Sequence, residues 1–220
     1  MPEATATAII SPSDQAEPVS TRGAEDACVV IFGASGDLTA RKLIPAVFAL
    51  WKDGYLSDRS PIVGAARRDK SDEQFRAEMH ESVSQYGRFG KISDEEWNRF
   101  AGRLYYRRIN LDAPDEYVIL RKQLEELEQK HGVADKRVFY MATSPDLFVP
   151  TTEAIGKAGM IPERRSKSIL RMVFEKPFGH DLESAQQLGR KLGRMLREEH
   201  IYRIDHYLGK ETVQNILLFR

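Results

Sequence analysis

The 220-residue sequence has one cysteine, Cys28, and no long apolar run. A single thiol excludes an intrachain disulfide framework and a zinc site built from several cysteines. No apolar stretch approaches the ~20 residues that a membrane span needs, so no membrane segment is predicted. The lack of disulfides is typical of a reducing compartment, and we expect a cytoplasmic protein.

Net charge is lacking as well, because 33 Lys and Arg balance 33 Asp and Glu. This balance gives no reason to expect nucleic acid or a membrane surface as a partner. The charges are nevertheless unevenly placed. Residues 1–26 carry five acids and one base, whereas residues 163–220 carry twelve bases and eight acids. The basic C-terminal third is either a solvated helix face or a surface that binds anions.

The first 26 residues also lack the marks of a targeting signal. They have neither a basic start nor a continuous apolar stretch, and they are rich in Ala, Thr, Ser and Pro. A transit peptide would be poor in acids and rich in Arg. We therefore expect a disordered acidic tail over 1–26.

After the tail, short apolar runs alternate with helical patterns. Pro45 falls inside the first helical pattern and is expected to kink that helix or to mark its effective start. Ser71 and Ser93 are expected to cap two helices, and Asp115 and Gly132 to cap the two ends of a third. The predicted strands are 27–32, 61–66, 104–111, 137–142 and 168–174, and the predicted helices are 38–51, 71–86, 93–100, 115–130, 145–157, 181–199 and 210–219. The alternation predicts an α/β fold with a mostly parallel sheet and helices on both faces.

A glycine turn follows the first predicted strand and opens the first predicted helix. A doubly wound Rossmann-like sheet binds the pyrophosphate of a dinucleotide here, because glycine lets the backbone approach the phosphates and the helix start offers free N–H groups. The G-x-x-G spacing is shorter than the full fingerprint, and an ordinary strand-to-helix turn is the alternative. The strand–turn–helix order favours a cofactor site made of Gly33, Ala34, Ser35, Gly36, Asp37, Leu38 and Thr39.

The end of the second predicted strand indicates which coenzyme binds. Enzymes that use NAD usually have an acid here, which binds the ribose 2′-hydroxyl. This chain has Arg67 and Arg68, and Asp69 follows both. Guanidinium groups bind phosphate oxygens in a bidentate way, which favours a 2′-phosphate. We therefore predict NADP as the cofactor, with Arg67 as a cofactor-binding residue and no metal.

Two further motifs lie in the basic C-terminal third: Glu-Lys-Pro-Phe-Gly at 175–179 and Arg-Ile-Asp-His-Tyr-Leu-Gly-Lys-Glu at 203–211. Together with the segment 33–42, they resemble glucose-6-phosphate dehydrogenase, from about Cys28 to the last residue. The resemblance implies an NADP-dependent oxidation of D-glucose 6-phosphate at C1 to 6-phosphogluconolactone, in the pentose phosphate pathway.

The resemblance also implies roles for single residues. Lys176 would contact both the coenzyme and the sugar phosphate. His206, Tyr207 and Lys210 would hold the substrate phosphate, and an imidazole and an ammonium four residues apart suit that dianion if they share a helix face. Asp205 would orient a histidine that acts as the base.

Part of the family pattern has no counterpart in this sequence. Family members have a C-terminal α+β domain that contains the catalytic histidine, and no histidine follows His206 here. We therefore predict an acidic tail at 1–26, an NADP-binding Rossmann-like domain at 27–200, and the start of the substrate-binding region at 201–220. Such a chain is expected to be an incomplete, inactive fragment that binds NADP weakly. Family members oligomerise through the missing domain, so a monomer is expected.

Two other functions share part of this pattern. A non-catalytic NADP-binding module would explain the missing base, but it needs no sugar-phosphate pocket. A different NADP reductase would carry a Tyr-x-x-x-Lys pair, whereas Tyr207 and Lys210 are three residues apart. The spacing argues against the reductase, and the module stays open.

Overall fold

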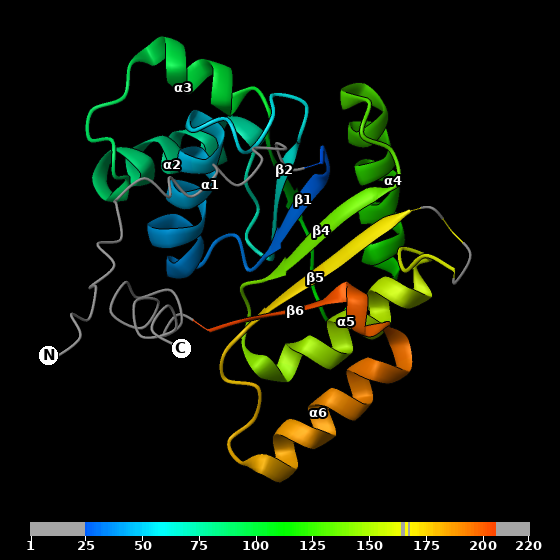
Figure 1. Cartoon of the computed structure of the whole chain (residues 1–220). Coiled ribbons are helices and arrows are strands. Elements are labelled where there is room, and N and C mark those ends of the chain that lie inside the picture. Colours follow the sequence, from blue (N-terminus) through cyan, green and yellow to red (C-terminus); the bar gives the residue numbers. More distant parts are fainter. Residues whose placement is uncertain (1–24, 164–165, 167, 206–220) are drawn as a thin grey trace, which may run out of the picture.

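The computed structural model describes residues 25–205 except 164, 165 and 167. Six parallel strands form one sheet in the order β3-β2-β1-β4-β5-β6 (Figure 1). This is the strand order of a doubly wound Rossmann sheet. The chain adds β2 and β3 on one side of β1 and then returns to add β4, β5 and β6 on the other side, so the order reverses between β1 and β4. The predicted α/β fold is confirmed. The strands are β1 (Cys28–Phe32), β2 (Ile62–Ala66), β3 (Leu104–Arg108), β4 (Lys136–Met141), β5 (Ile169–Glu175) and β6 (Ile201–Ile204).

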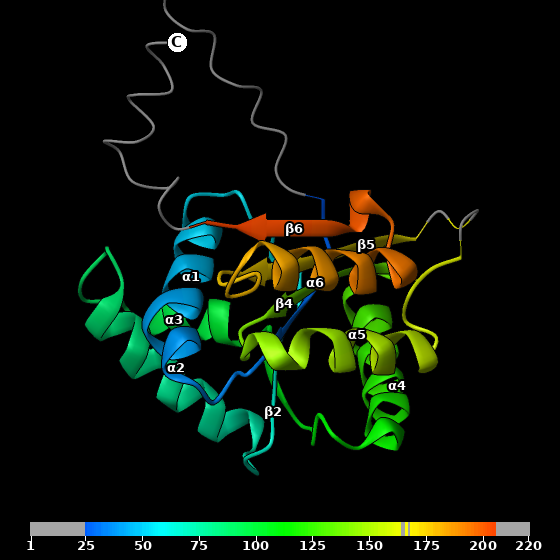
Figure 2. The same ribbon diagram turned by 90° about the horizontal axis from the view of Figure 1, so that it is seen from below.

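Helices cover the two faces of the sheet (Figure 2). In β1, Ile31 packs toward one layer of helices, and Val30 and Phe32 pack toward the other. Burial on both sides explains why the central strands β1 and β2 are uninterrupted apolar runs. One layer is α1 (Ile44–Lys52), α2 (Asp72–Tyr86) and α3 (Asp94–Ala101); the other is α4 (Pro114–His131), α5 (Phe148–Lys157) and α6 (Leu182–Met195).

Most of the helix caps predicted from the sequence are present in the structure. The Ser71 hydroxyl accepts a hydrogen bond from the Gln74 N–H, and Ser93 caps α3 in the same way. Gly132 closes α4 in the left-handed conformation, at φ 67°. The predicted cap at Asp115 is wrong. Helix α4 begins one residue earlier, at Pro114, which suits a first turn because it has no N–H to leave unpaired.

Two segments differ from their prediction. The first helical pattern starts with a π-helical turn, Thr39–Leu43, and Pro45 lies in the first turn of α1, so it marks the start of that α-helix. The helix predicted over 181–199 ends at Met195, and β6 follows a single turn of 3₁₀-helix. The predicted helix over 210–219, and all of the predicted tail except residues 25 and 26, lie outside the described residues.

Two buried arginines at the amino edge of the sheet form ion pairs. The Arg137 Nε atom lies 2.5 Å from Glu128 Oε1, and these side chains are 11% and 3% exposed. Arg103 is buried, donates to the Ser57 carbonyl at 2.5 Å and pairs with Asp58. These pairs join the start of β3 and β4 to the neighbouring loop and helix.

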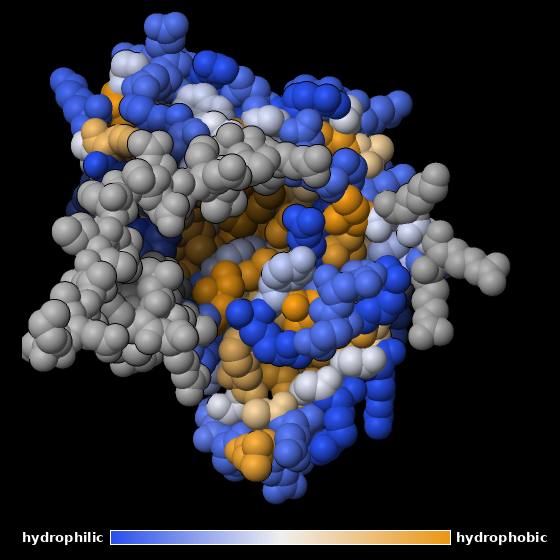
Figure 3. Space-filling view, viewed as in Figure 1, coloured by the Kyte–Doolittle hydropathy of each residue, from blue (hydrophilic) through white to orange (hydrophobic). Residues whose placement is uncertain are grey.

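The face of β4, β5 and β6 on the side of α1–α3 has no helix over it in the described part of the chain. Tyr140 and Val173 are half-buried there, and Tyr202 is exposed. Apolar side chains form the floor of a hollow over β4 and β5 (Figure 3). Among the helices of residues 25–205, none is long and apolar enough to span a membrane.

Candidate functional site

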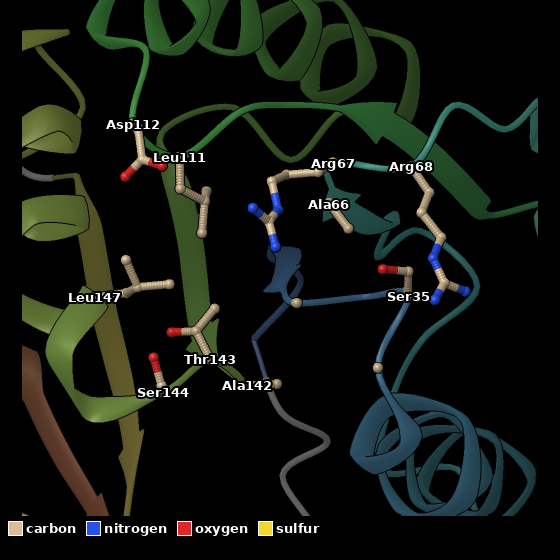
Figure 4. Close-up of a pocket in the computed structure, with 12 residues that line it drawn as sticks. Ser35, Ala66, Arg67, Arg68, Leu111, Asp112, Ala142, Thr143, Ser144 and Leu147 are labelled. Carbon is tan, nitrogen blue, oxygen red and sulfur yellow. The ribbon is translucent and has the colours of Figure 1, made fainter.

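A cavity of about 470 Å³ lies at the carboxyl edge of the sheet, where the strand order reverses between β1 and β4 (Figure 4). Ligands of open α/β sheets bind outside the carboxyl ends of the strands at this point. The lining residues come from the turns after four strands: Gly33, Ser35 and Gly36 after β1; Ala66, Arg67 and Arg68 at β2; Leu111 and Asp112 after β3; and Ala142, Thr143, Ser144 and Leu147 after β4.

The glycine turn forms the floor of the cavity. Gly33 has φ 86°, and a Cβ atom there would lie 2.3 Å from the Ala142 carbonyl oxygen. The Gly33 N–H donates to the Ala65 carbonyl at 2.9 Å, and the Thr39 hydroxyl lies 3.3 Å from the Gly33 carbonyl oxygen. The turn is therefore held against β2 on one side and β4 on the other.

The residues of the predicted cofactor turn fall into two groups. Gly33, Ser35 and Gly36 line the cavity, together with the predicted Arg67. The others do not line it. Ala34 is 1% exposed, the Thr39 side chain supports the turn from within, and Asp37 pairs with Arg41 at 3.3 Å on the surface. Leu38 directly precedes the π-helical turn.

One end of the cavity is cationic. Figure 4 shows the Arg67 guanidinium pointing into the cavity and the Arg68 guanidinium lying beside Ser35. Neither side chain makes an ion pair within the described residues, whereas Arg107 and Arg108, at the end of β3, pair with Asp72 and Glu116. Two exposed cations without an acidic partner create a positive potential that attracts an anion.

The opposite wall carries polar groups that the sequence interpretation did not include. Thr143 and Ser144 follow β4, and Asp112 lies in the turn after β3. Their positions at strand ends were visible in the sequence. Their convergence was not, because it depends on β4 lying beside β1 and on β3 lying two strands away on the other side.

The predicted Lys176 and Asp205 meet at the same edge of the sheet, outside the cavity lining. Lys176 follows β5 and Asp205 follows β6, and their Nζ and Oδ2 atoms are 2.5 Å apart. The peptide bond between Lys176 and Pro177 is cis. The predicted substrate residues His206, Tyr207 and Lys210 lie outside the described residues.

A hydrogen-bonded polar pair includes Glu175, the residue before Lys176. Glu175, 9% exposed, accepts a hydrogen bond from the Tyr140 hydroxyl on the neighbouring strand. Burial raises the pKa of Tyr140, and the hydrogen bond and negative charge of Glu175 raise it further. Tyr140 is therefore a neutral donor over the whole physiological pH range.

Residues 30–215 match the family described as glucose-6-phosphate dehydrogenase, NAD binding domain. The chain belongs to the glucose-6-phosphate dehydrogenase family. It is 43% identical over 196 residues to glucose-6-phosphate 1-dehydrogenase of Chlamydia muridarum, a match that covers 88% of this chain and 39% of the relative. It is 37% identical over 194 residues to the Bacillus subtilis protein of the same name, over 88% of this chain and 38% of the relative.

Solved structures of the glucose-6-phosphate dehydrogenase family have the same fold. One, described as glucose-6-phosphate dehydrogenase in complex with its substrate glucose-6-phosphate, superposes with a TM-score of 0.75 at 38% identity, over 89% of this chain and 40% of that one. Glucose-6-phosphate 1-dehydrogenase from Mycobacterium avium gives 0.73 at 31% identity, with the same coverage. This chain therefore spans about 40% of the length of these relatives and contains their coenzyme-binding domain.

Proposed function

We propose that this chain binds NADP in the cavity of Figure 4 and forms the coenzyme-binding part of a dehydrogenase that oxidises D-glucose 6-phosphate at C1 to 6-phosphogluconolactone. The observation that carries the coenzyme assignment is the pair Arg67 and Arg68, which lie beside the glycine turn without an acidic partner in the described structure. The family membership supports the reaction.

The cavity suits each phosphate of NADP. The 2′-phosphate binds at the cationic end, where Ser35 offers a hydroxyl between the two guanidinium groups. The pyrophosphate lies over Gly33 and Gly36, because the absence of side chains allows close approach and the positive end of the helix dipole that follows favours an anion. Asp69, the acid that would favour NAD, does not line the cavity.

The substrate is proposed to bind beyond the nicotinamide, at the ends of β5 and β6. Bound NADP supplies the hydride acceptor. Lys176 places a positive charge at this edge, and its ion pair with Asp205 restrains it there. Asp205 then has two roles, holding Lys176 and orienting the histidine base of the family. His206, Tyr207 and Lys210 are proposed to bind the substrate phosphate.

Replacing Arg67 by Ala tests the coenzyme assignment. Calorimetric titration is expected to show NADP affinity reduced about 10- to 100-fold, since a charge-assisted hydrogen bond contributes about 1.5–3 kcal/mol. The affinity for NAD is expected to change less than about twofold, because NAD lacks the 2′-phosphate. Arg194→Ala removes an exposed arginine on α6 and is the matched control. Equal losses for NADP and NAD in Arg67→Ala would contradict the proposal.

Titration with glucose 6-phosphate tests the substrate assignment separately. Binding of both NADP and glucose 6-phosphate, with the sugar phosphate affinity lowered by Lys176→Ala, supports the dehydrogenase. Binding of NADP alone supports the non-catalytic module instead. The proposal also places the chain in the cytoplasm as a monomer, and light scattering of the purified chain measures its mass directly.

A further inference from the structure

Strand β3 forms one edge of the sheet, so one side of its backbone has no neighbouring strand. An edge strand offers N–H and C=O groups with which a strand of another chain can pair. The Arg103 carbonyl and the Ile109 N–H bond to β2. Because such bonds alternate along a parallel strand, Leu104, Tyr106 and Arg108 turn their backbone groups outward, away from β2.

Both outward backbone groups of Tyr106 are bonded to side chains. The Tyr106 N–H donates to Asp72 Oδ1 at 2.6 Å, and the Tyr106 carbonyl accepts from Arg107 Nη1 at 2.6 Å. The Arg107 and Asp72 side chains also pair with each other, 3.0 Å apart. A further strand would bond to the same N–H and carbonyl. Asp72 and Arg107 therefore block the middle of β3 for strand pairing.

The two ends of β3 are bonded in the same way. Arg76, one turn further along α2, donates from Nε to the Leu104 carbonyl at 3.0 Å, and its guanidinium lies 5.7 Å from the centre of the Tyr105 ring. After the strand, Glu116 of α4 accepts a hydrogen bond from the Asn110 N–H at 2.7 Å. Side chains from α2 and α4 thus bond to the outer side of this edge at its start, middle and end.

Helix α2 does not need these polar contacts to stay in place. Its apolar residues Phe75, Met79 and Val83 are buried in the core beneath the layer α1–α3. Removing the Asp72 and Arg76 side chains is therefore expected to expose the β3 backbone without displacing the helix.

We propose that Asp72 and Arg76 keep the β3 edge closed to a second copy of this chain. A second copy is the expected partner, because two β3 edges that pair around a twofold axis cover each other and the contact closes. Leu104, Tyr105 and Tyr106 are apolar and aromatic, and such side chains favour strand pairing. With the two polar side chains absent, the sheets of two copies are expected to join at β3.

The double variant Asp72→Ala/Arg76→Ala tests the proposal. Sedimentation velocity over a range of protein concentrations measures association, and the association constant of the dimer is expected to rise at least about tenfold over that of the unaltered chain. Hydrogen exchange of the Tyr106 amide locates the contact. In the double variant this amide should exchange faster at low concentration and become protected as the dimer forms.

The matched control is Glu73→Ala. It removes the neighbouring carboxylate in the first turn of α2, whose side chain is 79% exposed and bonds to no backbone group of β3 among the described residues. This variant should associate no more than the unaltered chain. Asp72→Asn keeps an acceptor oxygen for the Tyr106 N–H and should also stay close to the unaltered chain.

Association of the double variant, with protection of the Tyr106 amide that rises with concentration, supports the proposal. A folded double variant that associates no more than the unaltered chain overturns it. Association that leaves this amide unprotected, or equal association of Glu73→Ala, overturns it as well. If the double variant does not fold, the same criteria apply to Arg76→Met, which keeps an apolar stem beside Tyr105. The measurements use no coenzyme, so their outcome is independent of the proposed function.

Discussion

Arginines occupy both edges of the sheet, in opposite surroundings. At the amino edge, Arg103 and Arg137 are buried against Asp58 and Glu128. At the carboxyl edge, Arg67 and its neighbour after β2 are exposed and face a cavity without an acidic partner in the described structure. The two buried arginines of the amino edge therefore stabilise the fold, whereas the two arginines after β2, unlike Arg107 and Arg108 at the end of β3, have no ion-pair partner in the described structure. The two groups of arginines differ in whether an acidic side chain pairs with them and in how deeply they are buried. Neither property can be read from the amino-acid composition.

The Glu128→Leu variant tests the amino edge most strongly. It leaves the Arg137 charge buried without its partner, and the free energy of unfolding is expected to fall by about 3–5 kcal/mol. Urea unfolding followed by circular dichroism measures this change. In the double variant with Arg137→Met, an apolar pair replaces the ion pair, and most of the loss should be recovered. A loss below 1 kcal/mol for Glu128→Leu alone would show that this pair is not structural.

Asp58→Ala is expected to have a smaller effect, about 1–3 kcal/mol, because it leaves the buried Arg103 donors unpaired while the Asp58 side chain itself is 46% exposed. The Trp51 indole N–H, which donates to Asp58 at 2.7 Å, also loses its acceptor. Thermal and urea unfolding measure the loss. Asp58→Asn keeps an acceptor oxygen and is expected to be intermediate.

The same carboxylate makes the effect depend on pH. Hydrogen bonding from Arg99, followed by that from Trp51 and Arg103, holds the pKa of Asp58 well below its usual range in the folded chain. Its contribution is therefore present above about pH 4, where the unfolded carboxyl is ionised, and decreases as the pH falls below that value. The stability difference between the unaltered chain and Asp58→Ala should shrink between pH 7 and pH 3. A constant difference would contradict this account.

The smallest effect on stability is expected at the carboxyl edge. Arg67→Ala and Arg68→Ala should each change the free energy of unfolding by less than about 0.5 kcal/mol, as is usual for exposed side chains without a partner. The stabilisation of the chain by saturating NADP should nevertheless decrease in both variants, as a smaller shift of the melting temperature. A loss of stability comparable to that of Glu128→Leu would remove the contrast between the two edges.

Much of the fold could be predicted because its signals are local. The segments that form β1 to β5 are short apolar runs flanked by turns and caps, so local sequence was enough to predict them. Strand β6 could not be found this way, because it has only four residues and Tyr202 and Arg203 interrupt its apolar character. Its place in the sheet comes from pairing with β5, in which Met172 lies opposite Ile201.

The residues of the candidate site also differ in whether the local sequence identifies them. The glycine turn and Arg67 directly follow strands that the sequence identifies, so local order was enough to propose them. Thr143, Ser144 and Asp112 become part of the cavity through the strand order, which brings together turns far apart in the chain. No local pattern distinguishes these residues from ordinary loop residues.

The Ala142 carbonyl fills the space that a side chain on Gly33 would need. Gly33, at the centre of the cavity floor, therefore cannot be replaced in protein engineering, because even an alanine side chain there would push β1 and β4 apart. The walls on either side of it follow different strands, and Arg67 on one wall and Ser144 on the other are exposed. A designer could vary Arg67, the residue proposed to bind the 2′-phosphate, and leave the turn beside it untouched.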